Sequence, residues 1–113
     1  MNKAFIPSSR ALGTRKLASV RADVEAFTGW VGTRSQLPGG VRAEFRTNSV
    51  VVWLDLDNDH AMQIARVQLR EGYWHLQWAD RSDGWRDYDD KSYLTLAIPM
   101  DLIDQDPDSV FWG

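Results

Sequence analysis

The chain has 113 residues, enough for one domain that buries about two-thirds of its unfolded surface. Its 43% hydrophobic and 26% charged residues are typical of a globular protein and exclude wholesale disorder. No apolar run approaches the ~18 residues of a membrane-spanning helix, and residues 1–13 lack a secretory signal, so we expect a cytoplasmic protein without membrane contact. The lack of cysteine excludes disulfides, thiolate catalysis and cysteine-bound zinc.

The net charge of −3 is unevenly distributed along the chain. Residues 1–22 carry five basic side chains and no acidic one, whereas the remainder carries 8 basic and 16 acidic side chains. Because an acidic body repels phosphate, we do not expect nucleic acid as the main partner. The basic segment supports one alternative hypothesis, a nucleic-acid accessory protein, although a solvated helix face is the favoured interpretation of Lys3, Arg10, Arg15, Lys16 and Arg21.

The N-terminal part of the chain divides into an arm and a helix. Pro7, two serines and Gly13 predict a flexible arm over residues 1–13, followed by a single domain over residues 14–113. Thr14 is the expected N-cap of an amphipathic helix that ends near Gly29 and Gly32. Its apolar face follows from steps of three and four between Leu17, Val20, Val24, Phe27 and Val31.

Beyond the loop at Pro38 the hydrophobic period changes to two, which predicts strands. Short turns separate the strands expected at 41–46, 50–56, 62–70, 73–80 and 85–89. The last part of the chain predicts a short helix from Pro99 to Asp106, with Ile98 outside it because a residue before proline disfavours helix. The apolar residues 110–112 are expected to dock on the body.

These elements predict an α+β fold. An N-terminal amphipathic helix packs on a four- to five-stranded antiparallel meander sheet, and a short C-terminal helix follows. Along the strand of residues 73–80 the alternation places Trp74, Leu76 and Trp78 on one buried face, and Trp85 on the next strand is expected to pair with that face.

A cluster of acidic residues raises the question of a metal site. Asp55, Asp57, Asp59 and His60 begin like a calcium-binding loop, but His60 stands where the loop needs glycine. Arg66 stands where a bidentate glutamate belongs. An acidic loop at a strand end is the favoured interpretation. A weak metal-dependent hydrolase that uses this cluster is kept as an alternative, and no cofactor is expected.

The hairpin "YWHLQWADRSDGWRDY" resembles the signature of a small bacterial family, domain of unknown function 3024. The motif W-x-L-x-W, followed by a turn and W-x-x-Y, carries the resemblance together with the C-terminal Phe-Trp-Gly. The chain departs from the family at Asp57-Asn58-Asp59, where an Arg-Pro-aromatic sequence is common, and at Gln77, where tyrosine is common. The resemblance implies the fold and a bacterial or mobile-element origin, and it implies no activity.

No catalytic set stands out, so the leading hypothesis is a non-catalytic protein-interaction module rather than an enzyme. Trp53 alternates with the core-facing residues of its strand, and Tyr73 and His75 lie opposite Trp74. The expected contact surface therefore comprises Trp53, Tyr73, His75 and Tyr88. Its partner is expected to be another protein or a second copy of the chain.

Overall fold

A computed structural model describes residues 5–34, 40–56, 59–82 and 84–112. It has the α+β architecture that the sequence predicts. The predicted loop residues Pro38 and Gly39 and the turn residue Asp83 lie outside the described residues. The described elements are α1 (Ser9–Leu12), α2 (Leu17–Gly32), β1 (Val41–Phe45), β2 (Ser49–Asp55), β3 (Ala61–Arg70), β4 (Tyr73–Asp80), β5 (Gly84–Asp87) and α3 (Ala97–Gln105).

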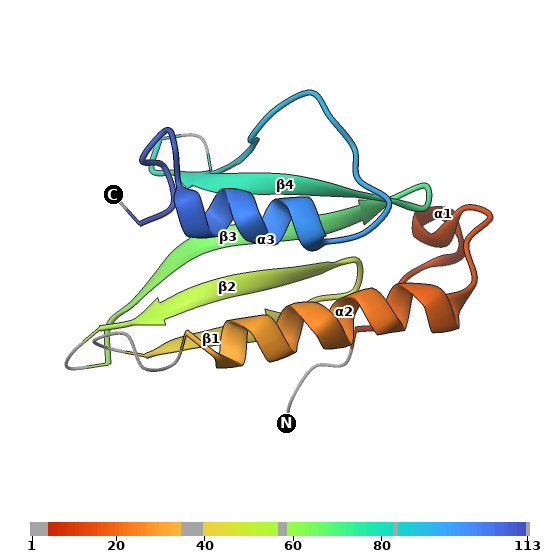
Figure 1. Cartoon of the computed structure of the whole chain (residues 1–113), viewed down its shortest axis with the longest axis horizontal. Coiled ribbons are helices and arrows are strands. Elements are labelled where there is room, and N and C mark those ends of the chain that lie inside the picture. The colour runs from red at the N-terminus through yellow and green to blue at the C-terminus, as the bar shows by residue number, and fades with distance from the viewer. Residues whose placement is uncertain (1–4, 35–39, 57–58, 83, 113) are drawn as a thin grey trace.

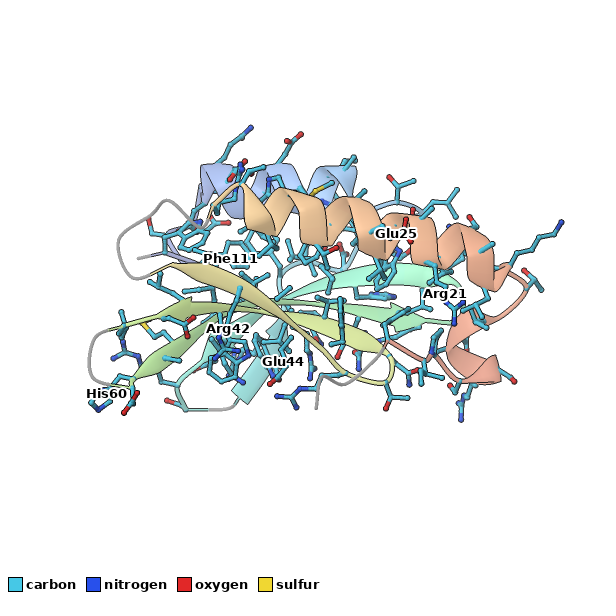
Figure 2. The ribbon with its side chains drawn as sticks, turned by 90° about the horizontal axis from the view of Figure 1, so that it is seen from below. Arg21, Glu25, Arg42, Glu44, His60 and Phe111 are labelled. Carbon is cyan, nitrogen blue, oxygen red and sulfur yellow. The ribbon has the colours of Figure 1, made fainter. Side chains whose placement is uncertain are left out.

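The five strands form one antiparallel sheet whose order follows the chain, β1-β2-β3-β4-β5. Both long helices, α2 and α3, lie over the same side of this sheet (Figures 1 and 2). The other side carries Arg42 and Glu44 of β1 and points away from the helices (Figure 2). The fold therefore has two layers, and only one sheet face is covered by helix.

The core fills the space between the helices and the sheet. Helix α2 buries the face that its periodicity predicts, namely Val20, Val24, Phe27 and Val31. The strands β1 to β4 contribute alternate residues, and Trp74 and Leu76 are at most 1% exposed while Trp78 packs against the same cluster. A register shift beside Val52 inserts one extra residue into β3, and Ile64 and Ala65 are consecutive and both buried.

Two details of α2 and α3 differ from the sequence-based prediction. Lys16, rather than Thr14, is the N-cap of α2, and no side chain caps it. Ile98 lies inside α3, whose first turn contains Pro99. The prediction for Ile98 was wrong because an N–H in the first helical turn has no partner within the helix, so proline fits there without loss.

The segment predicted as a flexible arm contains a helix and a core residue. Phe5 is 7% exposed, and its ring lies 5.8 Å from that of Trp74. Ser8 caps α1 by accepting a hydrogen bond from the Ala11 N–H at 3.2 Å. The Gly72 N–H donates to the Ala11 carbonyl at 2.7 Å, which ties α1 to the turn between β3 and β4.

A nearly buried polar cluster connects α2 to the sheet. Arg15 and Asp23 form an ion pair at 3.0 Å, with side chains that are 14% and 13% exposed. The same Asp23 oxygen accepts the indole N–H of Trp74 at 3.0 Å. Arg15 also donates to the carbonyl oxygens of Gly72 and Leu94. This cluster satisfies polar groups that would be costly to bury alone.

Helix α3 ends at Asp106, whose carboxylate holds the C-terminal segment in place. Asp106 adopts a left-handed backbone conformation with φ 42°. Its side chain accepts the N–H groups of Val110, Phe111 and Trp112 at 2.8, 3.1 and 2.9 Å. Phe111 is 3% exposed and the two neighbours pack against the core, so the predicted docking of residues 110–112 is confirmed.

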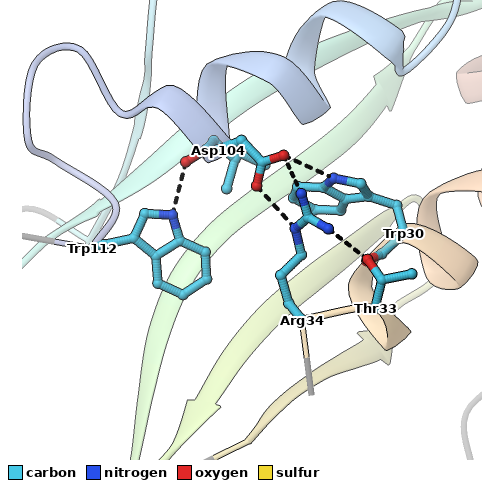
Figure 3. Close-up of polar contacts among 6 residues, drawn as sticks. Trp30, Thr33, Arg34, Asp104 and Trp112 are labelled. Carbon is cyan, nitrogen blue, oxygen red and sulfur yellow. Dashed lines mark hydrogen bonds and ion pairs between the residues drawn. The ribbon is translucent and has the colours of Figure 1, made fainter. Parts of the chain in front are cut away.

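A group of polar contacts joins the C-terminal end of α2 to α3 (Figure 3). Arg34 forms an ion pair with Asp104, and the indole N–H of Trp30 donates to the same carboxylate at 3.3 Å. The Arg34 guanidinium also stacks 4.5 Å from the centre of the Trp30 ring. Trp112 donates its indole N–H to the Ile103 carbonyl at 2.7 Å. These contacts hold the two helices side by side over the sheet.

Candidate functional site

The sheet face opposite α2 and α3, here called the open face, gathers most of the residues of interest. Its side chains alternate with the core residues in the register of the five strands. Val51 is 1% exposed although it lies on this face, because longer side chains surround it. The open face includes Arg42, Glu44, Arg46, Ser49, Val51, Trp53, Asp55, Gln63, Arg66, Gln68, Arg70, Tyr73, His75, Gln77, Ala79, Trp85 and Asp87.

A hydrogen-bonded network crosses the centre of the open face. Gln77 is 4% exposed, and its amide donates to Asp87 Oδ1 at 2.9 Å and accepts from Arg66 Nε at 2.5 Å. Arg70 donates to both carboxylate oxygens of Asp87, at 3.2 and 2.8 Å. The Nε of Arg70 also donates to Gln68 Oε1 at 2.8 Å. The network fixes side chains of β3, β4 and β5 relative to one another.

Two arginines of this face stack on tryptophan rings. The guanidinium carbon of Arg42 lies 5.2 Å from the centre of the Trp53 ring, and that of Arg66 lies 5.0 Å from the Trp85 ring. Each such contact contributes about 0.5–1 kcal/mol at a partly exposed site. The same guanidinium of Arg42 is also bound by Asp55, at 2.9 Å. These contacts restrict the orientation of both rings.

Burial and the nearby arginines shift the pKa of three groups on the open face. Burial lowers the pKa of Arg66, and the charges of Arg70 and Arg46 lower it further. The hydrogen bond from Arg70 holds the pKa of Asp87 below its ordinary value. Burial, and then Arg70, lower the pKa of His75 below 6.5, so the imidazole is neutral at pH 7.

The structure places three of the four predicted contact residues on the open face. Tyr73 is 49% exposed, His75 is partly exposed, and Trp53 lies across the sheet on β2. Tyr88 lies on the helix side instead, with its ring 5.4 Å from that of Phe111. Its hydroxyl donates to Asp108 at 2.5 Å, which raises the pKa of Tyr88 to about 12. Tyr88 thus stabilises the C-terminal segment and does not join the other three.

The indole N–H group of Trp53 is in an unusual environment. Its indole nitrogen is buried and has no hydrogen-bond partner among the described residues. A buried donor without an acceptor destabilises a fold by about 1–3 kcal/mol.

We therefore expect the substitution Trp53→Phe to change the free energy of unfolding by less than about 1 kcal/mol, because the lost ring contacts are offset by removal of the unpaired donor. The matched control Trp74→Phe should lower it by about 2–3 kcal/mol, since that change deletes a bonded N–H in a fully buried ring. Urea unfolding followed by circular dichroism measures both. Equal losses of unfolding free energy in the two variants would mean that the Trp53 N–H has a hydrogen-bond partner.

The candidate metal ligands do not come together in the described structure. Asp55 is bound to Arg42, and Asp57 lies outside the described residues. Asp59 and His60 are exposed, and His60 points outward at the far end of the molecule (Figure 2). Among the described residues, no three histidine, cysteine or acidic side chains are close enough to hold a metal ion.

The basic side chains of the N-terminal segment do not form one cluster among the described residues either. Lys3 lies outside the described residues, and Arg15 belongs to the nearly buried cluster with Asp23. Arg10 extends from α1 beside the β3–β4 turn, and Lys16 and Arg21 are exposed. No helix in the part of the chain that the structure describes is long and apolar enough to cross a membrane.

Sequence reasoning missed the residues at the centre of the open face. A signal for them exists, because the two-residue turn Glu71-Gly72 fixes the register of β3 against β4. That register sets Arg66 beside Gln77 and Arg70 beside Tyr73. Trp85 was expected on the buried face, but it pairs with Ala79 and lies on the open face. The tryptophans thus divide into two on the open face and four on the helix side, Trp30, Trp74, Trp78 and Trp112.

Comparison with known protein families gives a match. The family described as domain of unknown function DUF3024 matches residues 15–113, from the arginine of the nearly buried cluster to the end of the chain. No curated protein and no solved structure matches the chain. The match covers the helices α2 and α3 and the whole sheet, whereas α1 precedes it. The chain therefore belongs to the DUF3024 family, as its aromatic hairpin and C-terminal Phe-Trp-Gly predict.

Proposed function

We propose that this protein is a non-catalytic interaction module that binds an acidic segment of a protein partner on its open face. The observation that supports the proposal is the composition of that face, which combines Trp53, Trp85 and Tyr73 with four arginines. Tryptophan, tyrosine and arginine are the residues that most often dominate the binding energy of protein interfaces. The network and the two cation–π contacts also hold five of these side chains in place, namely Trp53, Trp85, Arg42, Arg66 and Arg70.

The charge of the open face favours an acidic partner. Four arginines stand against the three acids Glu44, Asp55 and Asp87, in a chain whose net charge is −3. Arg66 lies close enough to Arg46 and Arg70 for their repulsion to lower its pKa. Carboxylates of a partner would relieve this repulsion and pair with the guanidinium groups.

A protein fits this surface better than a nucleic acid does. Single-stranded nucleic acids bind sheets by stacking bases on free aromatic faces. Here one face of each tryptophan ring is already occupied by Arg42 or Arg66. Asp87 itself is poorly suited to act as a general base, because its lowered pKa makes its carboxylate a weak base at pH 7.

The proposal can be tested with short peptides of defined charge. We expect a peptide rich in aspartate, glutamate and leucine to shift the backbone amide signals of the open-face residues in nuclear magnetic resonance spectra. A lysine-rich peptide of equal length should leave them unchanged. The substitution Tyr73→Ala should weaken binding by about tenfold, as expected when an exposed aromatic contact is lost.

The matched control is Ile98→Ala on α3. Ile98 is 55% exposed, close to the 49% of Tyr73, but it lies on the helix side. Its substitution should leave peptide affinity unchanged. Stronger binding of a single-stranded oligonucleotide, or self-association of the chain through this face without peptide, would contradict the proposal. So would an absence of signal changes at millimolar acidic peptide.

A further inference from the structure

A pocket of about 610 Å³ lies at one end of the open face. Helix α1, the turn that contains Asn48 and the hairpin of β3 and β4 form its walls. This volume is within the range of about 300–1,000 Å³ that is typical of sites for small molecules. Tyr73 and His75 belong to both the pocket and the open face, but Arg10 of α1 belongs only to the pocket.

Backbone contacts fix the walls of the pocket. The Gly72 N–H donates to the Ala11 carbonyl at 2.7 Å, and the Ser8 N–H donates to Asn48 Oδ1 at 3.0 Å. A Cβ atom at Gly13, which has φ 60°, would lie 2.8 Å from the Glu71 carbonyl group. Helix α1 therefore docks against the hairpin as closely as backbones allow. A cavity with such fixed walls loses little conformational freedom when it binds a ligand.

The pocket is rich in hydrogen-bond donors that the described chain does not use. Arg10, Tyr73 and His75 donate no side-chain hydrogen bond to another described residue. Arg70 uses three N–H groups of its guanidinium on Asp87 and Gln68, and two of its five remain. Against these donors stands one carboxylate of the lining, Glu71. This imbalance favours a ligand that brings oxygen acceptors.

We propose that this pocket binds the oxyanion group, phosphate or carboxylate, of a small molecule, with Arg10 and Arg70 as its main donors. Planar guanidinium groups bind both kinds of oxyanion through paired hydrogen bonds. Tyr73 and His75 supply further donors from β4. The inference goes beyond the interaction module, because Arg10 lies outside the open face and the pocket needs no docked protein to bind a small anion.

The pKa of the His75 imidazole should change when an anion occupies the pocket. Burial and Arg70 lower its pKa, whereas Asp87 and Asp89 raise it. Arg10 and Glu71 are the other charged groups of the lining. A bound anion adds negative charge beside the ring and raises the pKa of His75. By linkage, protonation of the ring must tighten anion binding, so affinity should increase as the pH falls through the pKa of His75.

The test uses the full chain and simple anions at constant ionic strength. Sodium sulfate, phosphate and acetate are titrated in place of chloride while the side-chain signals of His75, Arg10 and Arg70 are followed by nuclear magnetic resonance. We expect saturable changes at these three side chains and a raised pKa of His75. Sulfate serves for the pH series because it does not titrate near neutrality. Tighter binding of sulfate and phosphate than of acetate assigns a phosphate group, and the reverse order assigns a carboxylate.

Two variants of the lining give opposite expectations. Arg10→Gln should weaken binding by about tenfold, because a charged donor is lost. Glu71→Gln should tighten it, because a repelling carboxylate is removed. Signals that move linearly with every anion, chloride included, would overturn the proposal, as would unchanged affinity of Arg10→Gln. Arg10 lies outside the open face, so these outcomes for small anions leave the acidic peptide to be judged by its own signals and by Tyr73→Ala.

Discussion

Replacement of Trp74 by alanine is expected to lower the free energy of unfolding by about 3–5 kcal/mol. Trp74 is 0% exposed, and its ring packs beside Phe5 in the core. The substitution opens a large cavity and also deletes the N–H bond to Asp23, which is nearly buried with Arg15. Domains of this size have a total stability of about 5–15 kcal/mol, so much of it would be lost. Urea-induced unfolding followed by far-ultraviolet circular dichroism measures the change.

The appropriate control is Trp85→Ala on the neighbouring strand. Trp85 is partly exposed on the open face, where it contacts Arg66. Its loss should cost about 1 kcal/mol, mainly the cation–π contact and some apolar contact area. If both alanine variants lost the same stability, the two faces of the hairpin would not differ in burial, and the assignment of core and open face would be incorrect.

Substitution of Asp106 by alanine should lower the free energy of unfolding by about 2–4 kcal/mol. Its carboxylate accepts three backbone N–H groups, from Val110, Phe111 and Trp112. A hydrogen bond to a charged group contributes about 1.5–3 kcal/mol net, and the loss is smaller where water can reach the freed N–H groups. The left-handed backbone of Asp106 is also less favourable for alanine. Amide hydrogen exchange of residues 110–112 should accelerate more than that of the sheet.

Two further variants separate the causes. Asp106→Asn keeps one carbonyl oxygen and tolerates the left-handed conformation. Its free energy of unfolding should therefore lie between those of the unmodified chain and of Asp106→Ala. Asp101→Ala changes an exposed acid of the same helix and should alter stability by less than about 0.5 kcal/mol. If residues 110–112 exchanged at the same rate in the Asp106→Ala chain as in the unmodified one, the carboxylate would not be what holds them.

Most of the fold could be predicted because the period of hydrophobic residues changes once, after the first helix. Alternation alone places Trp74, Leu76 and Trp78 on one face, and steps of three and four orient α2. Helix α1 was missed because four residues show no period, and its stability depends on the Ser8 cap and on docking to a distant hairpin. The face of Trp85 was missed because it depends on the length of a turn rather than on its own strand.

The candidate site was predictable only in part. Alternation predicted Trp53, Tyr73 and His75 away from the core, and the structure places them on one face. The contacts of Arg66, Arg70 and Asp87 were not predicted, since a charge gives no sign of its partner across a sheet. Alternation along β5 puts Tyr88 on the face opposite Trp85, so the wrong face for Trp85 also misplaced Tyr88, whose neighbours Phe111 and Asp108 come from the chain's end.

The division of the six tryptophans has a spectroscopic consequence. Intrinsic fluorescence of this chain mixes emission from four rings on the helix side and two on the open face. A chain in which Trp53 and Trp85 are both replaced by phenylalanine would emit only from rings that pack against the core. The emission of this double variant would report on unfolding of the core alone. The difference between its emission and that of the unmodified chain would report on changes around the two rings of the open face.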